Sequence, residues 1–204
     1  MGPQKHWDDI YAGRSPEVFS WFRPHLETSI SLIERAAPHR SACIIDVGGG
    51  ESTLVDDLLA KGYQNIDVLD ISQNALEVTK TRLGDASKAV GWLCADIRTV
   101  TLPRHSFDVW HDRAVFHFLT DARDRVDYVK QVEKTVKPGG HVIVSTFGTA
   151  GPEKCSGLEV VRYSSSSLHN EFGRRFQLVE SSSELHHTPT GTTQQFIYCW
   201  CVVE

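Results

Sequence analysis

Three consecutive glycines after an apolar run are the feature that most constrains this chain. Residues 42–47 form a nearly continuous apolar stretch, which is typical of a parallel strand covered on both faces. Gly48, Gly49 and Gly50 follow directly. Glycine permits backbone conformations that other residues avoid, and it leaves no side chain between main-chain N–H groups and a ligand. The chain is therefore expected to turn sharply at the end of a buried strand and to offer a binding surface there.

The residues after the glycines predict the rest of a β-α-β unit. Leucines at helical spacing indicate a helix over residues 51–61, and residues 66–70 indicate the next strand. That strand ends in Asp70, at the spacing from Gly50 where a β-α-β nucleotide site places a carboxylate on the ribose hydroxyls. A dinucleotide site would need a third glycine where this chain has Thr53, so the spacing disfavours NAD. A turn that binds nothing is the alternative.

The run Asp46-Val47-Gly48-Gly49-Gly50 followed by Asp70 resembles the signature of class I S-adenosylmethionine-dependent methyltransferases, among them the small Rossmann-like domains of types 11, 12 and 25. In that family the ligand has no phosphate, and the glycine turn accommodates its amino-acid end. Ser52 is a departure, because the family often has a glycine at that position. The resemblance implies an enzyme with S-adenosylmethionine as its cofactor. It also implies a set of cofactor-binding residues in this stretch, namely Asp46, Gly48, Gly49, Gly50, Ser52, Asp70 and Ile71.

The third expected strand, residues 90–94, is followed by another acid. In the resembled family this position contacts the adenine, which implies cofactor-binding roles for Ala95, Asp96 and Ile97. Asp96 would accept a hydrogen bond from the exocyclic amine, and Ile97 would flank the ring. Taken alone, an aspartate here would favour a helix cap, but its place after the third strand favours the binding role.

A turn rich in polar residues leaves the fourth expected strand, residues 106–111. The first and fourth strands of a doubly wound sheet adjoin where the strand order reverses, and ligands bind outside the strand ends there. We therefore take His111, Asp112 and Arg113 as candidate catalytic residues, with Asp112 also near the cofactor. A histidine with a near-neutral pKa is a natural proton acceptor.

Further acceptor-side candidates lie later in the chain. His117 is embedded in an apolar run, which favours a core position over a catalytic one. Residues 148–163 are expected to be an irregular loop that lines the acceptor site and contributes Cys155, Arg162 and Tyr163. The Asn/Asp-Pro-Pro-Tyr motif of amino and amide methyltransferases does not follow the fourth strand, which disfavours adenine and glutamine amide acceptors.

The segment before the first strand is rich in aromatic residues. Trp7 and Tyr11 recur at helical spacing, and a second helix is expected over residues 24–37. The His-Trp-Asp-x-x-Tyr pattern followed by Trp21 resembles small methyltransferases whose N-terminal segment closes over the cofactor, which implies that Trp7, Tyr11 and Trp21 contact it. A plain helical cover on the sheet and a lid over the ligand both fit this pattern.

The remaining patterns complete an α/β domain. They predict a helix over residues 121–136 that a turn at residues 137–140 closes, a strand at 141–147, a short helix at 164–171, and strands at 176–180 and 193–203 joined by a turn at 186–191. The resemblance spans residues 7–147 and implies a seven-stranded Rossmann-like doubly wound sheet of order 3-2-1-4-5-7-6. One strand would be antiparallel, and helices would cover both faces. We expect one domain over residues 1–204, with a helical lid or cover at 1–40 and the core at 41–204.

The composition of the chain excludes several classes of binding partner. A net charge of -5 and a pI near 6.0 provide no broad basic surface, so no nucleic acid is expected. The five cysteines lack metal-site spacing, so neither a disulfide framework nor a metal is expected. The chain has no membrane-length apolar run, which predicts a cytoplasmic protein without a membrane partner. The predicted function is methyl transfer to a small-molecule acceptor. The alternatives are a protein lysine methyltransferase, with a protein substrate, and a non-catalytic nucleotide-binding module.

Overall fold

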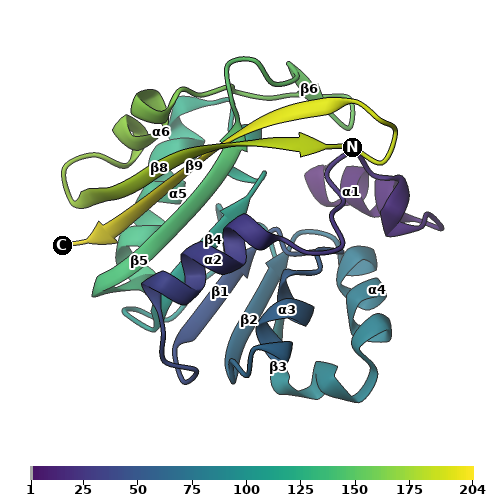
Figure 1. Cartoon of the computed structure of the whole chain (residues 1–204), viewed down its shortest axis with the longest axis horizontal. Helices are drawn as coiled ribbons and strands as arrows, with labels where there is room; N and C mark the ends of the chain where they lie inside the picture. The colour runs from purple at the N-terminus through teal and green to yellow at the C-terminus, as the bar shows by residue number, and fades with distance from the viewer. Residues whose placement is uncertain (1) are drawn as a thin grey trace.

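The computed structural model describes residues 2–204 and contains a seven-stranded sheet with helices on both faces (Figure 1). The elements in chain order are α1 (Pro3–Tyr11), η1 (Pro16–Val18), α2 (Glu27–Ala36), β1 (Cys43–Val47), α3 (Leu54–Ala60), β2 (Asn65–Asp70), α4 (Gln73–Leu83), η2 (Gly84–Ala89), β3 (Val90–Cys94), β4 (Phe107–Arg113), η3 (Phe116–Phe118), α5 (Ala122–Thr135), β5 (Val136–Phe147), β6 (Lys154–Cys155), β7 (Leu158–Glu159), α6 (Ser165–Phe172), β8 (Phe176–His187) and β9 (Thr193–Val203). Between residues 2 and 204, no helix is long and apolar enough to cross a membrane.

The strand order confirms the predicted doubly wound fold. The sheet runs β3-β2-β1-β4-β5-β9-β8, and β6 and β7 form a separate small sheet. Strands β1 to β5 pair in parallel, whereas β9 is antiparallel to both β5 and β8. When β6 and β7 are set aside, this is the order 3-2-1-4-5-7-6 with one antiparallel strand next to an edge. The order reverses between β1 and β4, so their carboxyl ends open a crevice.

Two apolar cores lie on opposite faces of the sheet. On one face, α2 and α3 contribute Ile33 and Leu54 to a core with Ile44 of β1. On the other face, α5 and α6 contribute Tyr128 and Leu168 to a second core. Residues 44 and 45 belong to different cores because neighbouring side chains of a strand point to opposite faces. Burial on both faces explains the continuous apolar run of β1.

The turn expected at residues 137–140 is part of a strand instead. β5 begins at Val136, and these residues form a bulge opposite Asp108, where the pairing with β4 shifts from Phe107↔Val136 to Val109↔His141. The Lys137 ammonium lies 2.8 Å from the Asp108 carboxylate and fixes the bulge. The chain therefore passes from α5 into β5 without a separate loop, which the turn-forming residues alone did not indicate.

Two further boundaries differ from the predictions. Residues 148–163 contain the short hairpin of β6 and β7, so the segment is more ordered than expected. β8 extends to His187, and the turn therefore follows the two histidines that were expected to lie within it. The His186 imidazole is buried, with Nε2 2.7 Å from the carbonyl oxygen of Ser20. This contact joins the end of β8 to the N-terminal segment, which explains why the strand continues.

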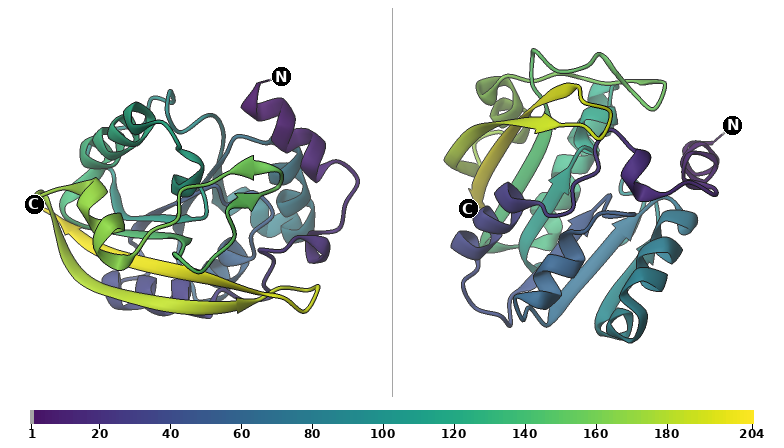
Figure 2. Two further views of the ribbon diagram at one scale, coloured as in Figure 1. Left: turned by 90° about the horizontal axis from the view of Figure 1, so that it is seen from above. Right: turned by 45° about the vertical axis from the view of Figure 1, so that its right-hand side comes forward.

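The N-terminal segment lies across the carboxyl ends of the strands, with α1 beside α4 (Figure 2). Ser72 caps α4 as predicted, because its hydroxyl accepts a hydrogen bond from the N–H of Ala75 at 3.2 Å. The same hydroxyl donates to Asp8 Oδ1 of α1 at 2.7 Å, and the amide of Asn74 donates to the Asp8 carbonyl oxygen at 3.0 Å. A single aspartate thus fastens α1 to the start of α4.

Candidate active site

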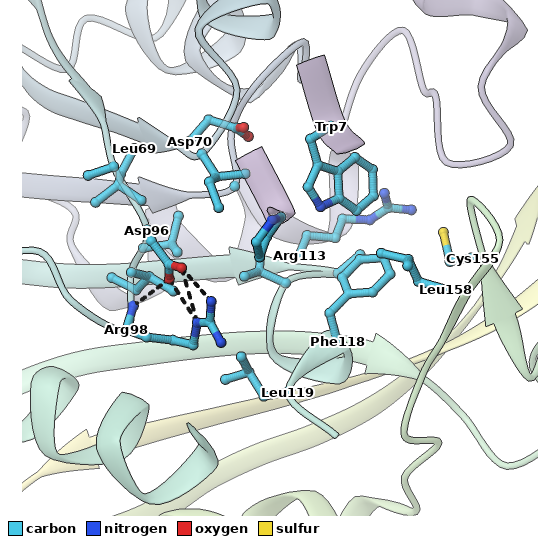
Figure 3. Close-up of a pocket in the computed structure, with 18 of the residues that line it drawn as sticks. Trp7, Leu69, Asp70, Asp96, Arg98, Arg113, Phe118, Leu119, Cys155 and Leu158 are labelled. Carbon is cyan, nitrogen blue, oxygen red and sulfur yellow. Dashed lines mark hydrogen bonds and ion pairs between the residues drawn. The ribbon is translucent and has the colours of Figure 1, made fainter. Parts of the chain in front are cut away.

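The carboxyl ends of the central strands open into a cavity of about 260 Å³, here called the larger cavity (Figure 3). It brings together many of the predicted residues: Trp7, Tyr11, Trp21, Gly48, Asp70, Ile71, Ala95, Asp96, Ile97, Arg113 and Cys155. A smaller cavity of about 50 Å³ adjoins it and contains Asp46, Ser52 and His111. Tyr11, Trp21, Gly48 and Arg113 line both cavities. These shared residues show that the two cavities are neighbouring parts of one region.

The glycine turn is tightly enclosed. Gly48 has a φ of +72°, and a Cβ there would collide with Val115. A Cβ on Gly49 would lie 2.5 Å from Asp46 Oδ2, and one on Gly50 would lie 2.7 Å from Asp70 Oδ2. The glycines therefore allow two carboxylates to approach the backbone of the turn. Gly49 and Gly50 support the cavity walls without lining either cavity.

Asp70 ends β2 beside the glycine turn, as predicted. It is almost fully buried, and its Oδ1 accepts a hydrogen bond from the N–H of Ser72 at 2.8 Å. Burial raises the pKa of Asp70 to about 7, even though the Ser72 N–H favours the ionised form. A carboxylate with free acceptor capacity therefore faces the larger cavity from the end of β2.

Asp96 lines the larger cavity after β3, but its carboxylate is already engaged. Arg98 Nη2 donates to Asp96 Oδ2 at 2.6 Å, and Arg98 Nε and N–H bind the other oxygen. Burial would raise the pKa of Asp96, but the hydrogen bonds from Arg98 outweigh burial and lower it. Arg98 also binds Asp124 at 2.9 Å. Neither Arg98 nor Asp124 was predicted, although a basic residue two positions after Asp96 was a visible signal.

A buried chain of polar groups lies under the smaller cavity. His111 Nδ1 lies 2.7 Å from Asp46 Oδ1, and His111 Nε2 lies 2.9 Å from the hydroxyl of Ser29. The Ser29 hydroxyl in turn lies 3.3 Å from that of Tyr198. Both nitrogens of His111 are therefore occupied within the protein. Its position does not match the role of a proton acceptor on the acceptor side, because the imidazole joins β4 to α2 and to the strand before the glycine turn.

Glu51 is a third residue that was not predicted. Its side chain is buried at the smaller cavity, and in the part of the chain that the structure describes neither carboxylate oxygen has a hydrogen-bond partner. Burial raises its pKa to about 7, although the charge of Arg82 acts in the opposite direction. Its place directly after the glycines was the available signal. With Asp46 Oδ2, which also lacks a partner, Glu51 provides acceptors for a cationic ligand group.

Asp112 does not face either cavity, which corrects its assignment to catalysis and to the cofactor. Its carboxylate is fully buried and accepts hydrogen bonds from the N–H groups of Val115 and Phe116 and from the hydroxyl of Tyr128. Burial raises its pKa to about 6 against the effect of these bonds. Asp112 therefore shapes the turn after β4 and acts on the site only through that turn.

The acceptor-side candidates later in the chain are also divided between residues that line a cavity and residues that do not. His117 is fully buried, and burial lowers its pKa to about 3, so it is a neutral core residue that accepts a hydrogen bond from the N–H of Phe147. Arg162 binds the carbonyl oxygens of Thr149 and Gly151 and orders the loop after β5. Arg162 and Tyr163 line neither cavity, whereas Cys155 does line the larger one. Burial raises the pKa of the Cys155 thiol to about 11, so the thiol is protonated near neutrality.

Aromatic side chains enclose one side of the larger cavity. The Trp7 ring centroid lies 5.1 Å from that of Phe118 and 6.3 Å from that of Trp21, while Tyr11 packs beside Trp7 at 5.9 Å. Figure 3 shows Asp96 and Arg98 on one side of the cavity and Phe118, Cys155 and Leu158 on the other. The N-terminal segment is therefore both a cover and a wall of the site. Phe118 and Leu158 were not predicted, because apolar residues in irregular segments carry no distinct signal.

The family match covers the centre of this architecture. Residues 45–144 match the family described as "Methyltransferase domain". An uncharacterized methyltransferase of Mycobacterium tuberculosis is 32% identical over 119 residues, which are 58% of this chain and 57% of the relative. An eEF1A lysine and N-terminal methyltransferase of Bos taurus is 27% identical over 144 residues, 70% of this chain but 20% of the relative. The chain thus matches little more than half the length of the mycobacterial relative.

A solved structure with the same fold has two bound ligands. It is a 1,6-didemethyltoxoflavin-N1-methyltransferase of Burkholderia thailandensis with bound 1,6-didemethyltoxoflavin and S-adenosylhomocysteine. The TM-score is 0.69 at 14% identity, and the match covers 98% of this chain and 83% of that one. Sheet order, glycine turn and family match agree. The chain therefore has the fold of class I S-adenosylmethionine-dependent methyltransferases, and its central residues, 45–144, match the methyltransferase domain family.

Proposed function

We propose that this protein transfers a methyl group from S-adenosylmethionine to a small-molecule acceptor by direct displacement. One observation carries this proposal. The buried carboxylate of Asp70 faces the larger cavity beside the glycine turn, and the same cavity continues into an aromatic compartment on its other side. A site with a polar nucleotide end and an apolar enclosed end suits two ligands that must meet.

The residues present fit the cofactor. Asp70 would accept hydrogen bonds from the ribose hydroxyls, and Asp96, sharing its carboxylate with Arg98, would bind the adenine amine beside Ile71 and Ile97. Asp46 and Glu51 provide buried acceptors without partners near the glycine turn, which suits the ammonium of an amino-acid end. No group of three or more side chains able to hold a metal ion occurs among residues 2–204.

The reaction would depend on alignment. The cofactor supplies an electrophilic methyl group on a sulfonium, and displacement needs the acceptor atom in line with it. Trp7, Trp21 and Phe118 would hold the acceptor and exclude water. No histidine lines the larger cavity among the described residues, and the Cys155 thiol is protonated, so the aromatic side of the cavity offers the acceptor no ready base. These features support an acceptor atom that is nucleophilic without a protein base.

A protein acceptor is the second candidate, and the similarity to an eEF1A lysine and N-terminal methyltransferase favours it. A lysine or an N-terminal amine brings positive charge to the methyl site, where an acidic groove would stabilise it. The aromatic side of the larger cavity instead carries the guanidinium of Arg113. The positive charge of Arg113 supports a small-molecule acceptor over a cationic protein acceptor. Consumption of S-adenosylmethionine would distinguish either enzyme from a non-catalytic nucleotide-binding module.

Calorimetric titration with S-adenosylmethionine, S-adenosylhomocysteine and NAD tests the cofactor assignment. We expect micromolar binding of the two adenosyl compounds, or about -8 kcal/mol, and no binding of NAD. Acceptor screens that detect S-adenosylhomocysteine release would then compare small molecules with peptides. Binding of none of the three compounds would contradict the proposal, and release only with peptides would assign the activity to the second candidate.

A further inference from the structure

Arg113 is the one charged side chain of the larger cavity that extends from the end of β4. Its side chain is only 7% exposed, and it lines both cavities. Nη1 donates to the carbonyl oxygen of Trp21 at 3.2 Å, while Nε and Nη2 are buried without a hydrogen-bond partner among the described residues. An ionised group in a low-dielectric site is costly unless its donors are paired. Two donors of a buried guanidinium are therefore available for a ligand.

Within residues 2–204, no neighbouring acid accepts a hydrogen bond from these donors. Glu184 Oε1 lies 3.9 Å from Arg113 Nη2, which is beyond hydrogen-bond distance, and the same oxygen lies nearer to Arg23, at 3.3 Å. The guanidinium carbon lies 4.2 Å from the centroid of the Phe196 ring, which has no oxygen or nitrogen acceptor. Arg98, the other arginine of the cavity, differs because Asp96 and Asp124 pair with it.

The residues around Arg113 indicate which kind of ligand would fit beside its guanidinium. Trp7, Phe118, Phe147 and Leu158 line the same cavity and present apolar surface. The planar fork of a guanidinium matches two oxygens of a carboxylate, and such charge-assisted pairs are stronger than neutral hydrogen bonds. A ligand that suits this compartment has an apolar, preferably aromatic, body and one carboxylate.

We propose that Arg113 binds the carboxylate of the methyl acceptor, so that the acceptor is an apolar or aromatic acid rather than a cationic peptide. This inference rests on the proposed methyltransferase function. The carboxylate anchors the acceptor and is not the methylated atom, because pairing with Arg113 lowers its nucleophilicity. The cofactor has a carboxylate of its own, so the experiment must separate the two sources.

The test uses two probes of nearly the same shape, 2-naphthoate and 2-naphthamide, titrated into protein saturated with S-adenosylhomocysteine. We expect the acid to bind about tenfold or more tightly than the amide, as for a hydrogen bond to a charged group. Arg113→Met should abolish this preference, and Arg113→Lys should keep part of it because the charge remains without the fork. Thermal melting of each variant shows that it is folded before titration.

Arg35 provides a matched control. It pairs with Glu180 of β8 and packs on Trp200 of β9 at 4.9 Å, much as Arg113 lies near Glu184 and Phe196 of the same strands. Arg35 lines neither cavity. Arg35→Met removes the same charge and the same kind of aromatic contact, so the preference for the acid should persist unchanged.

The outcomes separate the proposals. If Arg113→Met weakens S-adenosylhomocysteine about tenfold but leaves 5′-methylthioadenosine unchanged, the guanidinium holds the carboxylate of the cofactor and our assignment is overturned. Equal binding of acid and amide, or binding of neither, also overturns it while the cofactor assignment stands. If S-adenosylhomocysteine itself does not bind, the proposed function fails first, and the assignment of Arg113 fails with it.

Discussion

The two sides of the larger cavity are built in different ways. The cofactor side consists of strand ends and the turns directly after them: Asp70 ends β2, while Gly48 and Asp96 come after β1 and β3. The acceptor side combines α1, the turn after β4 and the β6–β7 hairpin, which contribute Trp7, Phe118 and Leu158. The first side depends on local geometry within one sheet. The second depends on segments that must pack together from distant parts of the chain.

The largest effect should come from filling the glycine turn. Gly48→Ala combines a positive φ with a collision against Val115, so we expect the free energy of unfolding to fall by about 3 kcal/mol. Gly157 of the β6–β7 hairpin is the matched control, because it has a φ of +80° but open space around its Cβ position. Gly157→Ala should cost about 1 kcal/mol. Similar losses in chemical denaturation would show that the two sides are equally constrained.

Removing the carboxylate at the end of β2 should weaken cofactor binding and leave acceptor binding unchanged. We expect Asp70→Ala to weaken S-adenosylhomocysteine by about tenfold or more, because a buried acceptor of charge-assisted hydrogen bonds is lost. Asp67 lies on the same strand and outside both described cavities, so Asp67→Ala should leave the affinity unchanged. Calorimetry on the folded variants measures both. If Asp70→Ala binds S-adenosylhomocysteine with unaltered affinity, Asp70 does not hold the cofactor.

The cofactor side should also respond to pH. Burial raises the pKa values of Asp70 and Glu51 to about 7, and the ionised forms bind hydroxyl and ammonium groups better. We expect the affinity for S-adenosylmethionine to rise severalfold from pH 6 to pH 8, with proton release on binding. Because the raised pKa values favour the protonated folded state, the stability of the free protein should fall as pH rises from about 4 to 7.

The variants Asp70→Asn and Glu51→Gln show how much each group contributes to the pH dependence of the affinity for S-adenosylmethionine. Each should remove part of it, and the double variant should bind with little dependence on pH over that range. A response that survives in the double variant would point to a titrating group elsewhere.

The smallest effect is expected in the protease sensitivity of the N-terminal segment that covers the acceptor side. If α1 is a lid, bound S-adenosylhomocysteine should slow protease cleavage between Trp7 and Trp21 by about twofold or more, because opening is then coupled to ligand release. Asp8→Ala removes the link to Ser72 and should speed cleavage of the free protein. Equal cleavage rates with and without ligand would leave the segment as a fixed cover.

The same division explains what the sequence could predict. Strand order, the glycine turn and the position of Asp70 at the end of β2 follow from local patterns and from the family resemblance, so these structural features were predicted correctly. The placements of His111 and Arg113 depend on partners far along the chain, such as Ser29 and Trp21. The buried polar roles of Asp112 and Glu51 depend on which side chains cover them. Neither kind of information is contained in the spacing of residues.

The tryptophans beside the cavity give the protein an optical property. Of its five tryptophans, Trp7 and Trp21 line the larger cavity, whereas Trp110 is fully buried and donates to the hydroxyl of Tyr128. Indole emission depends on polarity and on nearby quenching groups, so the two cavity residues should report ligand entry while Trp110 remains a constant background. The stacked Phe19 ring, 4.8 Å from that of Trp21, holds one of these reporters in place. Site occupancy can therefore be followed by intrinsic fluorescence, without a label and without turnover.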